Sequence, residues 1–388
     1  MKDYHLLLAC DKHYLPYMFV ACQSVLNSIK NSSRGINNDE RVIFNVIIDS
    51  SVDLEKTKTL TDSFCKRNDF INTKFCFHNT DAEKFANARG WGEYDSRSVY
   101  YRLLINRFIE TTVSKVLYID IDILVLGDVR QLIDIDMRDK TLGAVYDPMS
   151  WRKDCIDGNV FLKPCNRKLD TVKINESNYF NSGVLLINLE RWRNDAIDTK
   201  SIDFIKAYNP LIIDQDTLNA ITKDNINLDW SWNFQTWMFY VDKDSCTENI
   251  GYLSHNSQST KYKFSCSKMY MDTLRKGINC CNIIHYTYCK PWKEHPLIPN
   301  SDWHYLFNEQ LVKSLQMWQE LARQTPECTG VHIPNTTNAS VLGDIANHTA
   351  IKLTKELEQI KYKRRKQNKI IISAIGALLV LQIISIFF

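Results

Sequence analysis

The chain has 388 residues, enough for a substantial hydrophobic core in one large domain or in two or three smaller ones. Its composition, 44% hydrophobic and 24% charged, is ordinary for a globular protein. The formal net charge of +3 is unevenly distributed, because six basic and no acidic residues follow residue 360, which leaves 42 basic and 45 acidic ones before it. The main part of the chain is therefore slightly acidic, which argues against nucleic acid as a partner.

The first part of the chain alternates between short apolar runs and amphipathic segments. Strands are predicted over residues 6–10, 42–48, 72–77 and 115–125, and helices over 15–30, 53–68 and 98–109. This alternation is typical of an α/β sheet with helices on both faces. Ligands of such sheets bind beyond the carboxyl ends of the strands, where Asp11 and Asp49 fall.

Two carboxylates, Asp120 and Asp122, interrupt the apolar run at 115–125. Residues two apart on a strand face the same side, and two like charges on a buried strand are costly unless a cation neutralises them. Paired carboxylates suit Mg²⁺ or Mn²⁺, which can also hold a diphosphate. We therefore predict a metal and diphosphate site here, and the alternative is two solvated aspartates in a turn.

The segment 370–388 is uncharged and almost wholly apolar. As a helix it would be about 28 Å long, close to the hydrocarbon thickness of a bilayer. The basic residues between 361 and 369 would stay on the cytoplasmic side and contact anionic lipid. We predict a transmembrane helix, with an interfacial helix or a buried core helix as alternatives.

The beginning of the chain shows no signal peptide, because the apolar run at 4–10 is short and lacks a cleavage site. We therefore expect the main body to stay in the cytosol. The twelve cysteines fit a reducing compartment, since they form no CxxC pair and no cluster at zinc-ligand spacing. Residues 326–349 are rich in Thr, Asn, Gly and Pro, which indicates a linker.

Five segments, including the acidic pair, follow one another along the chain. They are 9–14 (ACDKHY), 118–122 (YIDID), 179–189 (YFNSGVLLINL), 214–219 (DQDTLN) and 285–292 (HYTYCKPW). In this order they resemble glycosyltransferase family 8, retaining enzymes of the GT-A nucleotide-sugar-binding fold that use UDP-sugars and Mn²⁺. The resemblance covers residues 1–295 and implies an α/β fold with a mixed, mostly parallel central sheet.

The resemblance also implies a role for individual residues. Asp120, Asp122 and His285 match the family's ligands for Mn²⁺ or Mg²⁺, and a His/Asp/Asp set suits Mn²⁺ because imidazole favours transition metals. Lys290 matches a lysine that contacts the diphosphate, where a positive charge stabilises the UDP leaving group. The remaining donor-binding positions are Asp11 and Tyr14 for uracil, and Arg102, Asp147 and Asn181 for the sugar.

Asp214 and Gln215 match the residues beneath the anomeric carbon, and Gln215 is the candidate to stabilise an oxocarbenium-like state. A glutamine amide is a poor nucleophile, so these residues favour front-face departure and attack over double displacement. The UDP phosphate would then help to deprotonate the acceptor. An alternative role for Asp214 is to cap a helix that begins near Asp216.

The chain departs from the family at one place. Tyr288 occupies the position of a glycine, and Lys290 follows His285 by five residues where the family has six. A bulky residue and a one-residue deletion change how closely the backbone approaches the phosphates. This departure favours an alternative, a catalytically weak UDP-sugar-binding or scaffold protein.

Residues 303–318 resemble the C-terminal extension of the family's lipopolysaccharide branch, which transfers glucose or galactose to a lipid-borne saccharide. The resemblance therefore implies an α-linking, UDP-glucose- or UDP-galactose-dependent hexosyltransferase at the cytoplasmic side of the inner membrane. The predicted membrane helix agrees, because anchoring raises the effective concentration of a lipid-linked acceptor. Enzymatic alternatives are a protein-modifying glycosyltransferase and a nucleotide-sugar hydrolase, although the sequence offers no identifiable water-activating base for the latter.

These observations divide the chain into five parts. The predicted parts are a GT-A catalytic domain (1–295), a helical extension (296–325), a linker (326–349), a basic juxtamembrane helix (350–369) and a transmembrane or membrane-embedded helix (370–388).

Overall fold

The structure is a computed structural model. It describes residues 1–80, 90, 96–147, 155–156, 159–165, 169–175, 179–208, 210–236, 238, 241–247, 250–253, 262–265, 276–287, 289–293, 309–337, 340, 354 and 357–364. The chain divides into two compact units, residues 1–336 and 337–388, and the elements below belong to the first unit.

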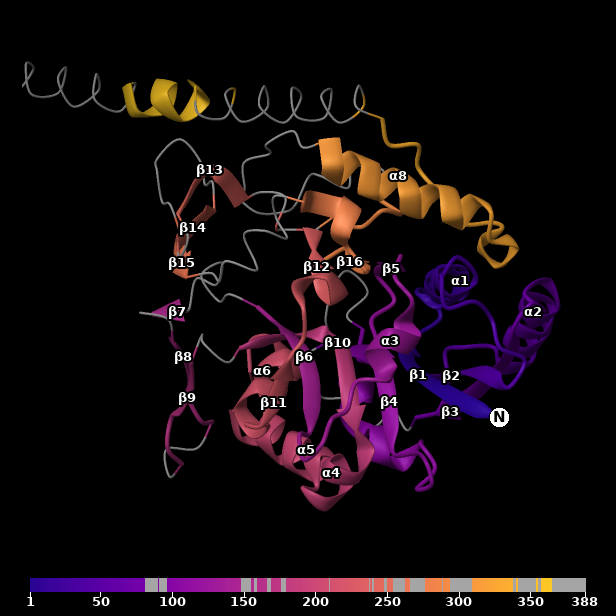
Figure 1. Ribbon diagram of the computed structural model, residues 1–388. Helices are drawn as coiled ribbons and strands as arrows, with labels where there is room; N and C mark the ends of the chain where they lie inside the picture. Colours follow the sequence, from indigo (N-terminus) through magenta and orange to yellow (C-terminus); the bar gives the residue numbers. More distant parts are fainter. Residues whose placement is uncertain are drawn as a thin grey trace, which may run out of the picture. The chain divides into compact units, whose positions relative to one another are not determined.

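A seven-stranded sheet with the order β11-β6-β10-β4-β1-β2-β3 forms the centre of this unit (Figure 1). Its strands are β1 (Lys2–Cys10), β2 (Glu40–Ile48), β3 (Asn72–Asn79), β4 (Lys115–Ile119), β6 (Leu142–Tyr146), β10 (Phe180–Asn188) and β11 (Asn225–Asn227). Only β10 runs antiparallel to its neighbours, and the other pairs are parallel. The α/β fold with a mixed, mostly parallel sheet is therefore confirmed.

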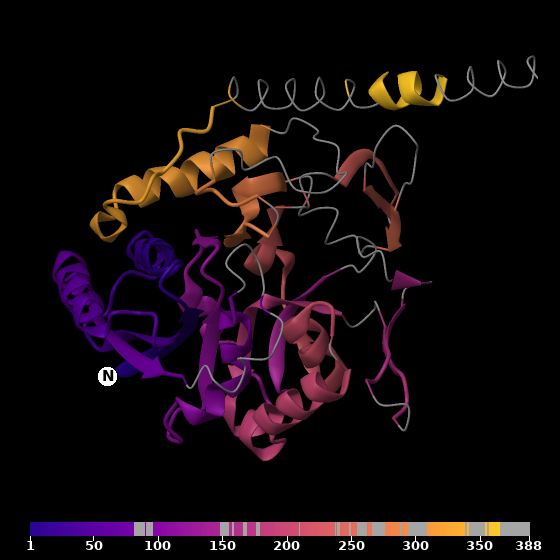
Figure 2. The ribbon, with the colours of Figure 1, turned by 180° about the vertical axis from the view of Figure 1, so that it is seen from behind.

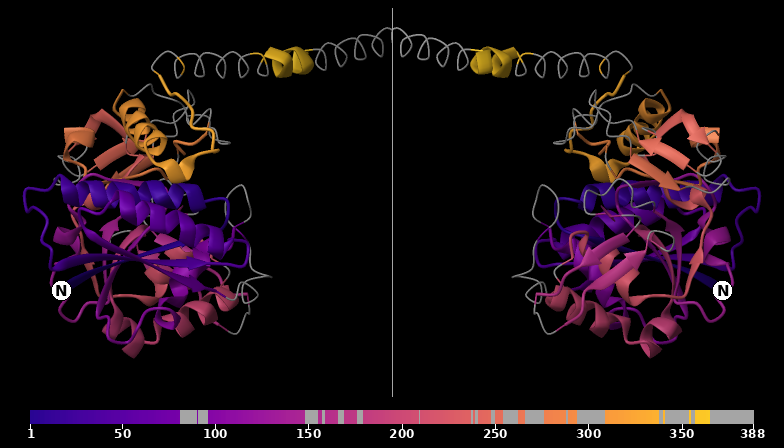
Figure 3. Two further views of the ribbon diagram at one scale, coloured as in Figure 1. Left: turned by 90° about the vertical axis from the view of Figure 1, so that its right-hand side faces the viewer. Right: turned by 90° about the vertical axis from the view of Figure 1, so that its left-hand side faces the viewer.

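Helices cover both faces of the sheet (Figure 3). On one side lie α1 (Leu15–Lys30) and α2 (Leu54–Arg67), and on the other η2 (Ser98–Arg107), α4 (Leu189–Asn194), α5 (Ile197–Tyr208) and α6 (Ile213–Ile221). Phe19 of α1 and Phe64 of α2 pack against Phe75 of β3, with ring centroids 6.2 and 5.5 Å from it. On the second side, Trp192 of α4 and Ile213 of α6 belong to one buried cluster with residues of β1, β4 and β10. Apolar residues on both faces thus hold the sheet as a central layer.

The helices predicted at 15–30 and 53–68 are confirmed as α1 and α2, whereas the segment predicted as a helix at 98–109 is the 3₁₀ helix η2, interrupted by non-helical backbone at Leu104. The single strand predicted over 115–125 is wrong. Its first part is β4, and its second part, β5 (Ile123–Val125), belongs to a separate sheet with β12 (Phe234–Gln235) and β16 (Ile283–His285).

Hydrogen bonds explain why the chain changes sheets at this point. The Asp120 N–H still donates to the Gly183 carbonyl on β10, at 2.8 Å, but the Asp122 carbonyl accepts from Tyr286, next to β16, at 2.8 Å. Asp120 and Asp122 are therefore not on one face of a strand. They lie in the turn between two sheets.

The helix α8 (Glu309–Arg323) packs against α1 (Figure 2) and holds the segment that follows β16. Gln319 of α8 donates from Nε2 to the Pro291 carbonyl at 2.8 Å. Trp292 stacks on Tyr17 of α1 with centroids 4.2 Å apart, and its ring lies 5.4 Å from that of Trp318 of α8. The segment that carries Lys290 is therefore fixed by two helices.

Smaller elements complete the description of this unit. They are α3 (Val129–Ile133), β7 (Cys155–Ile156), β8 (Asn159–Leu162), β9 (Val172–Asn175), η5 (Trp230–Asn233), β13 (Val241–Thr247), β14 (Ile250–Leu253), β15 (Tyr262–Ser265), η7 (Gly277–Cys280) and η8 (Pro326–Cys328). No disulfide bond is formed by Cys10, Cys22, Cys65, Cys76, Cys165, Cys281 or Cys328.

Within the described residues, no helix combines the length and the apolar character that crossing a bilayer requires. The segment 370–388, for which a membrane helix is predicted, lies outside the described residues. The five-part division of the chain also stays a prediction.

Candidate active site

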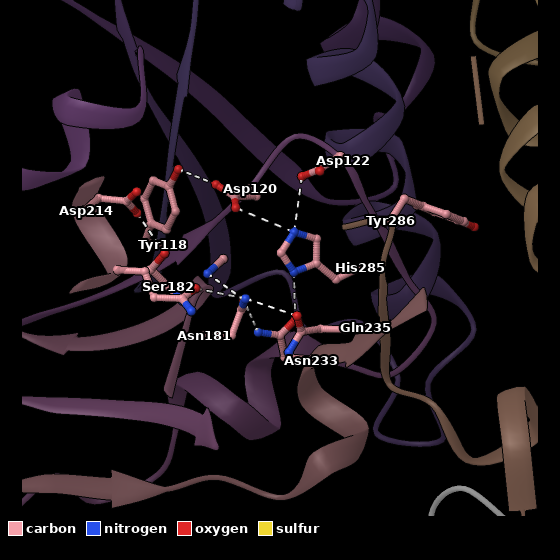
Figure 4. Close-up of polar contacts among 12 residues, drawn as sticks. Tyr118, Asp120, Asp122, Asn181, Ser182, Asp214, Asn233, Gln235, His285 and Tyr286 are labelled. Carbon is pink, nitrogen blue, oxygen red and sulfur yellow. Dashed lines mark hydrogen bonds and ion pairs between the residues drawn. The ribbon is translucent and has the colours of Figure 1, made fainter. Parts of the chain in front are cut away.

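Most of the predicted site residues come together beyond the carboxyl ends of β1 and β4 (Figure 4). Asp120 follows β4, Asn181 lies in β10, Asp214 lies in α6 and His285 ends β16. Four separate stretches of the chain thus contribute these side chains to one place.

The predicted metal ligands lie close together. Asp120, Asp122 and His285 offer ligand atoms that all lie within 4.8 Å of one another. Nε2 of His285 is 3.6 Å from Oδ2 of Asp120 and 3.3 Å from Oδ1 of Asp122 (Figure 4). One imidazole nitrogen and two carboxylates are a donor set that fits Mn²⁺. The same set fits Mg²⁺ less well, because imidazole favours transition metals.

A glycine makes this approach possible. A Cβ at Gly183 would lie 2.2 Å from Cε1 of His285 and 2.8 Å from Oδ2 of Asp120. Real Cβ atoms do not tolerate such distances, and the buried ring has little room to move. Asp120 and His285 can therefore approach each other only because Gly183 has no side chain. Below, the three residues Asp120, Asp122 and His285 are called the metal cluster.

Lys290 lies against the metal cluster. Its ammonium group forms an ion pair with Asp122 and donates to the Tyr286 carbonyl at 2.6 Å. Burial opposes ionisation of Asp122, but Lys290 and His285 together hold the pKa of this carboxyl well below its usual range. The contact of Lys290 with a diphosphate stays a prediction, and Tyr288 lies outside the described residues.

Arg102 is buried between two acidic residues. Its Nη2 lies 2.6 Å from Oδ1 of Asp120, and its Nη1 lies 3.1 Å from Oδ2 of Asp214. The guanidinium also donates to the Ser182 carbonyl at 2.8 Å and lies 4.3 Å from the centre of the Tyr118 ring. Burial raises the pKa of Asp214, and Arg102 opposes this effect. Arg102 is thus a buried part of the site.

The capping role considered for Asp214 is wrong. α6 begins at Ile213, so Asp214 lies inside its first turn, and its carboxylate accepts from the Ser182 hydroxyl at 2.7 Å. It is Asp216 whose carboxylate accepts from a backbone N–H at this helix end, that of Ile212, at 3.0 Å.

Three other predicted residues form a buried hydrogen-bond network. Nδ2 of Asn181 donates to Oε1 of Gln215 at 3.0 Å, and Nε2 of Gln215 donates to Oδ2 of Asp147 at 3.1 Å. The Ser182 N–H also donates to Oε1 of Gln215, at 3.2 Å, and Gln235 accepts from Asn181 at 3.2 Å. The side chains of Asp147, Asn181 and Gln215 are therefore held in one orientation.

The predicted uracil-binding residues lie at the start of α1. Asp11 accepts the His13 N–H at 2.9 Å and the Ser96 hydroxyl at 2.6 Å, which orders the turn before the helix. The Tyr14 ring packs edge-on against Trp292, with centroids 6.0 Å apart. Their roles in nucleotide binding stay predictions.

Several residues of the site were not predicted from the sequence. They are Tyr118, Ser182, Gly183, Asn233 and Gln235. The first three fall within segments already recognised, so a survey of whole motifs would have found them. Asn233 and Gln235 lie in a stretch with no recognised pattern, and only the pairing of β12 with β16 brings them to His285.

The comparison with known families agrees with this geometry. The model of glycosyl transferase family 8 matches residues 5–295. General stress protein A of Bacillus subtilis is 28% identical over 249 residues, 63% of this chain and 78% of that protein. Lipopolysaccharide 1,3-galactosyltransferase of Salmonella typhimurium is 24% identical over 257 residues, 62% and 66% of the two chains. A Haemophilus influenzae relative is 29% identical over 225 residues, and the chain spans only 60% of its length.

Solved structures give the same result for the fold. The galactosyltransferase LgtC, in complex with donor and acceptor sugar analogs, superimposes with a TM-score of 0.55 at 23% identity, over 83% of this chain and 95% of that one. The fold is thus that of a GT-A-like glycosyltransferase. The chain belongs to glycosyltransferase family 8.

A side chain at position 183 should abolish the metal cluster. We expect Gly183→Ala to weaken Mn²⁺ binding by at least about tenfold, because the new methyl group displaces His285. The free Mn²⁺ signal in electron paramagnetic resonance measures this affinity. Gly143→Ala is the control, because its Cβ would lie 3.3 Å from the flexible Leu228 side chain. Equal Mn²⁺ affinity of Gly183→Ala and the wild type would contradict the assignment.

Removal of Lys290 should strengthen the binding of metal alone. In Lys290→Met the ammonium group no longer competes for Asp122, and we expect Mn²⁺ affinity to rise about tenfold, equivalent to about 1.4 kcal/mol. Binding of UDP to the Mn²⁺-loaded variant should weaken, if Lys290 contacts the diphosphate. Lys293→Met, three residues further along, is the control for a general charge effect. Weaker Mn²⁺ binding by Lys290→Met would show that the ion pair does not compete with the metal.

Proposed function

We propose that the protein is a membrane-attached, Mn²⁺-dependent, retaining hexosyltransferase. It transfers glucose or galactose from a UDP-sugar to a lipid-linked saccharide, such as a lipopolysaccharide core, and forms an α linkage. The observation that carries this proposal is the position of the His/Asp/Asp cluster beside a buried amide network, in a member of glycosyltransferase family 8.

The donor half of the proposal rests on the chemistry of the cluster. Asp120, Asp122 and His285 would hold the ion, which when bound supplies positive charge to the diphosphate of the donor. The sugar would then lie towards Asn181 and Gln215, whose amides offer hydrogen bonds to its hydroxyl groups.

The contacts of Gln215 and Asp214 bear on the stereochemical course. Oε1 of Gln215 already accepts two hydrogen bonds, from Asn181 and from the Ser182 N–H, which makes this oxygen less nucleophilic. Asp214 is engaged by Arg102 and the Ser182 hydroxyl. Both observations make a covalent intermediate on these side chains less favourable. They support a role in which the Gln215 amide dipole stabilises the oxocarbenium-like state, and so they favour front-face attack.

The proposal of a lipid-linked acceptor rests on similarity to relatives and on the apolar segment 370–388. The Salmonella typhimurium relative is a lipopolysaccharide 1,3-galactosyltransferase, and an Escherichia coli relative, 25% identical over 130 residues, is a lipopolysaccharide 1,2-glucosyltransferase. The apolar segment 370–388 would hold the enzyme at the inner membrane, with its catalytic unit on the cytoplasmic side.

A second candidate is a UDP-sugar-binding protein with weak activity. The observation that favours it is the ion pair of Lys290 with Asp122, since a lysine kept there does not stabilise the leaving group.

Release of UDP tests the reaction class. We expect slow hydrolysis of either UDP-glucose or UDP-galactose with Mn²⁺, none with EDTA, and none by Asp122→Ala, because the metal cluster is then incomplete. The control is Asp139→Ala, which removes an exposed carboxylate that lies beside Lys140 and does not belong to the cluster. UDP release that survives both EDTA and Asp122→Ala would refute a metal-dependent transferase.

The two candidates differ when acceptor is supplied. Turnover that begins only after addition of a membrane lipid extract supports the transferase with a lipid-linked acceptor. Metal-dependent UDP binding without turnover, with or without the extract, supports the binding protein.

Deletion of residues 361–388 tests the membrane attachment. We expect the truncated protein to move from the membrane fraction to the supernatant, because both the basic and the apolar segments are lost. A variant with Lys363, Arg364 and Arg365 replaced by Ser keeps the apolar segment and should resist a carbonate wash. A deletion variant that stays equally membrane-bound would exclude anchoring by the tail.

A further inference from the structure

Backbone N–H groups fix the direction of a hydrogen-bond chain that ends at the metal cluster. The Gly183 N–H donates to Oδ1 of Asn181 at 2.9 Å, and a backbone N–H can only donate. Nδ2 of Asn233 donates to the same oxygen at 2.8 Å. The amino group of Asn233 therefore faces Asn181, and its carbonyl oxygen faces the other way.

That carbonyl oxygen lies 2.9 Å from Nδ1 of His285 (Figure 4). An amide oxygen can only accept a hydrogen bond, so the imidazole carries a proton on Nδ1. The lone pair available to a metal is then on Nε2, the nitrogen that faces Asp120 and Asp122. The backbone thus determines, through two amide side chains, which nitrogen of His285 binds metal.

We propose that Asn233 is a positioning residue for the metal site, which fixes the Nδ1–H tautomer and the ring orientation of His285. This inference rests on the proposed function only in requiring that the cluster bind a divalent cation. Through Asn181, Asn233 is also connected to Gln215, so one chain of amides orients both the metal ligand and the candidate catalytic side chain.

Because these residues are buried, their hydrogen bonds to one another determine how the side chains are oriented. Asn233 is 0% exposed, His285 3% and Asn181 6%, so bulk water offers little competition for these groups. The position of Asn233 is set from both sides: Asp229 caps η5 by accepting the Ser231 N–H at 2.9 Å, and β12 begins at the next residue and pairs with β16. A lost hydrogen bond here leaves buried polar groups without partners.

Three variants separate positioning from a general structural effect. Asn233→Leu removes both hydrogen bonds, whereas Asn233→Asp keeps an oxygen for Nδ1–H and replaces the amino group that faces Asn181 with a negatively charged oxygen. Asn45→Leu is the matched control, because it removes a buried asparagine of β2 whose side chain bonds to the Leu6 carbonyl in β1 and to His78 in β3, and not to the metal ligands.

Mn²⁺ affinity is measured by electron paramagnetic resonance, with and without UDP. We expect Asn233→Leu to weaken Mn²⁺ binding by about 10- to 100-fold, Asn233→Asp to recover most of this loss, and Asn45→Leu to resemble the wild type. Equal losses in Asn233→Leu and Asn45→Leu would mean a structural role only. A wild-type protein that binds no Mn²⁺ in either condition would also overturn the inference.

The tautomer is observed directly in a long-range ¹H–¹⁵N spectrum of the metal-free protein, at a pH where the imidazole is neutral. The His285 signals are identified by their loss in His285→Gln. We expect a protonated Nδ1 in the wild type and in Asn233→Asp, and a mixture of tautomers in Asn233→Leu. A wild-type ring protonated on Nε2 would refute the inference, even where Asn233→Leu fails to fold. Neither measurement needs glycosyl transfer, so failure of the proposed function would be seen separately, in the UDP-release experiment.

Discussion

The site depends on the buried ion pairs of Arg102. This one side chain binds Asp120 after β4, Asp214 in α6 and the carbonyl of Ser182 in β10. Breaking a buried ion pair by removal of one partner costs about 3–5 kcal/mol, because an uncompensated charge remains. The end of the central sheet and the helix that carries Gln215 are therefore held in a fixed relation by electrostatics as well as by apolar packing.

The charges of the site are incompletely balanced by the protein. Four carboxylates, those of Asp120, Asp122, Asp147 and Asp214, are metal-ligand candidates or contact Arg102 or Gln215, while Arg102 and Lys290 supply two positive charges. The formal sum is −2, the charge that a divalent cation neutralises. If Lys290 leaves Asp122 to bind a diphosphate, one negative charge of the metal cluster is no longer neutralised by the protein. The cluster then attracts a cation more strongly.

Sequence reasoning succeeded where a local pattern carries the information. Helices α1 and α2 and the parallel strands follow from apolar periodicity. The acidic pair pointed to the group of Asp120, Asp122 and His285 that could hold a metal ion, although for a strand geometry that the chain does not have. The break after Ile119 is invisible in an apolar run that continues on both sides, because it depends on hydrogen bonds to β10 and β16. Asn233 could not be found, since 52 residues separate it from His285 and only sheet pairing joins them.

The contacts of α8 show how far the compact first unit of this protein extends along the chain. The family match ends at residue 295. Gln319 and Trp318, which lie beyond it, contact Pro291 and Trp292 next to Lys290. Glu327 of η8 forms a bidentate ion pair with Arg67 of α2. A fragment cut at the end of the family match would keep every metal ligand but expose the apolar surface that α8 covers. The compact unit therefore extends to Thr336, beyond the residues that match the family model.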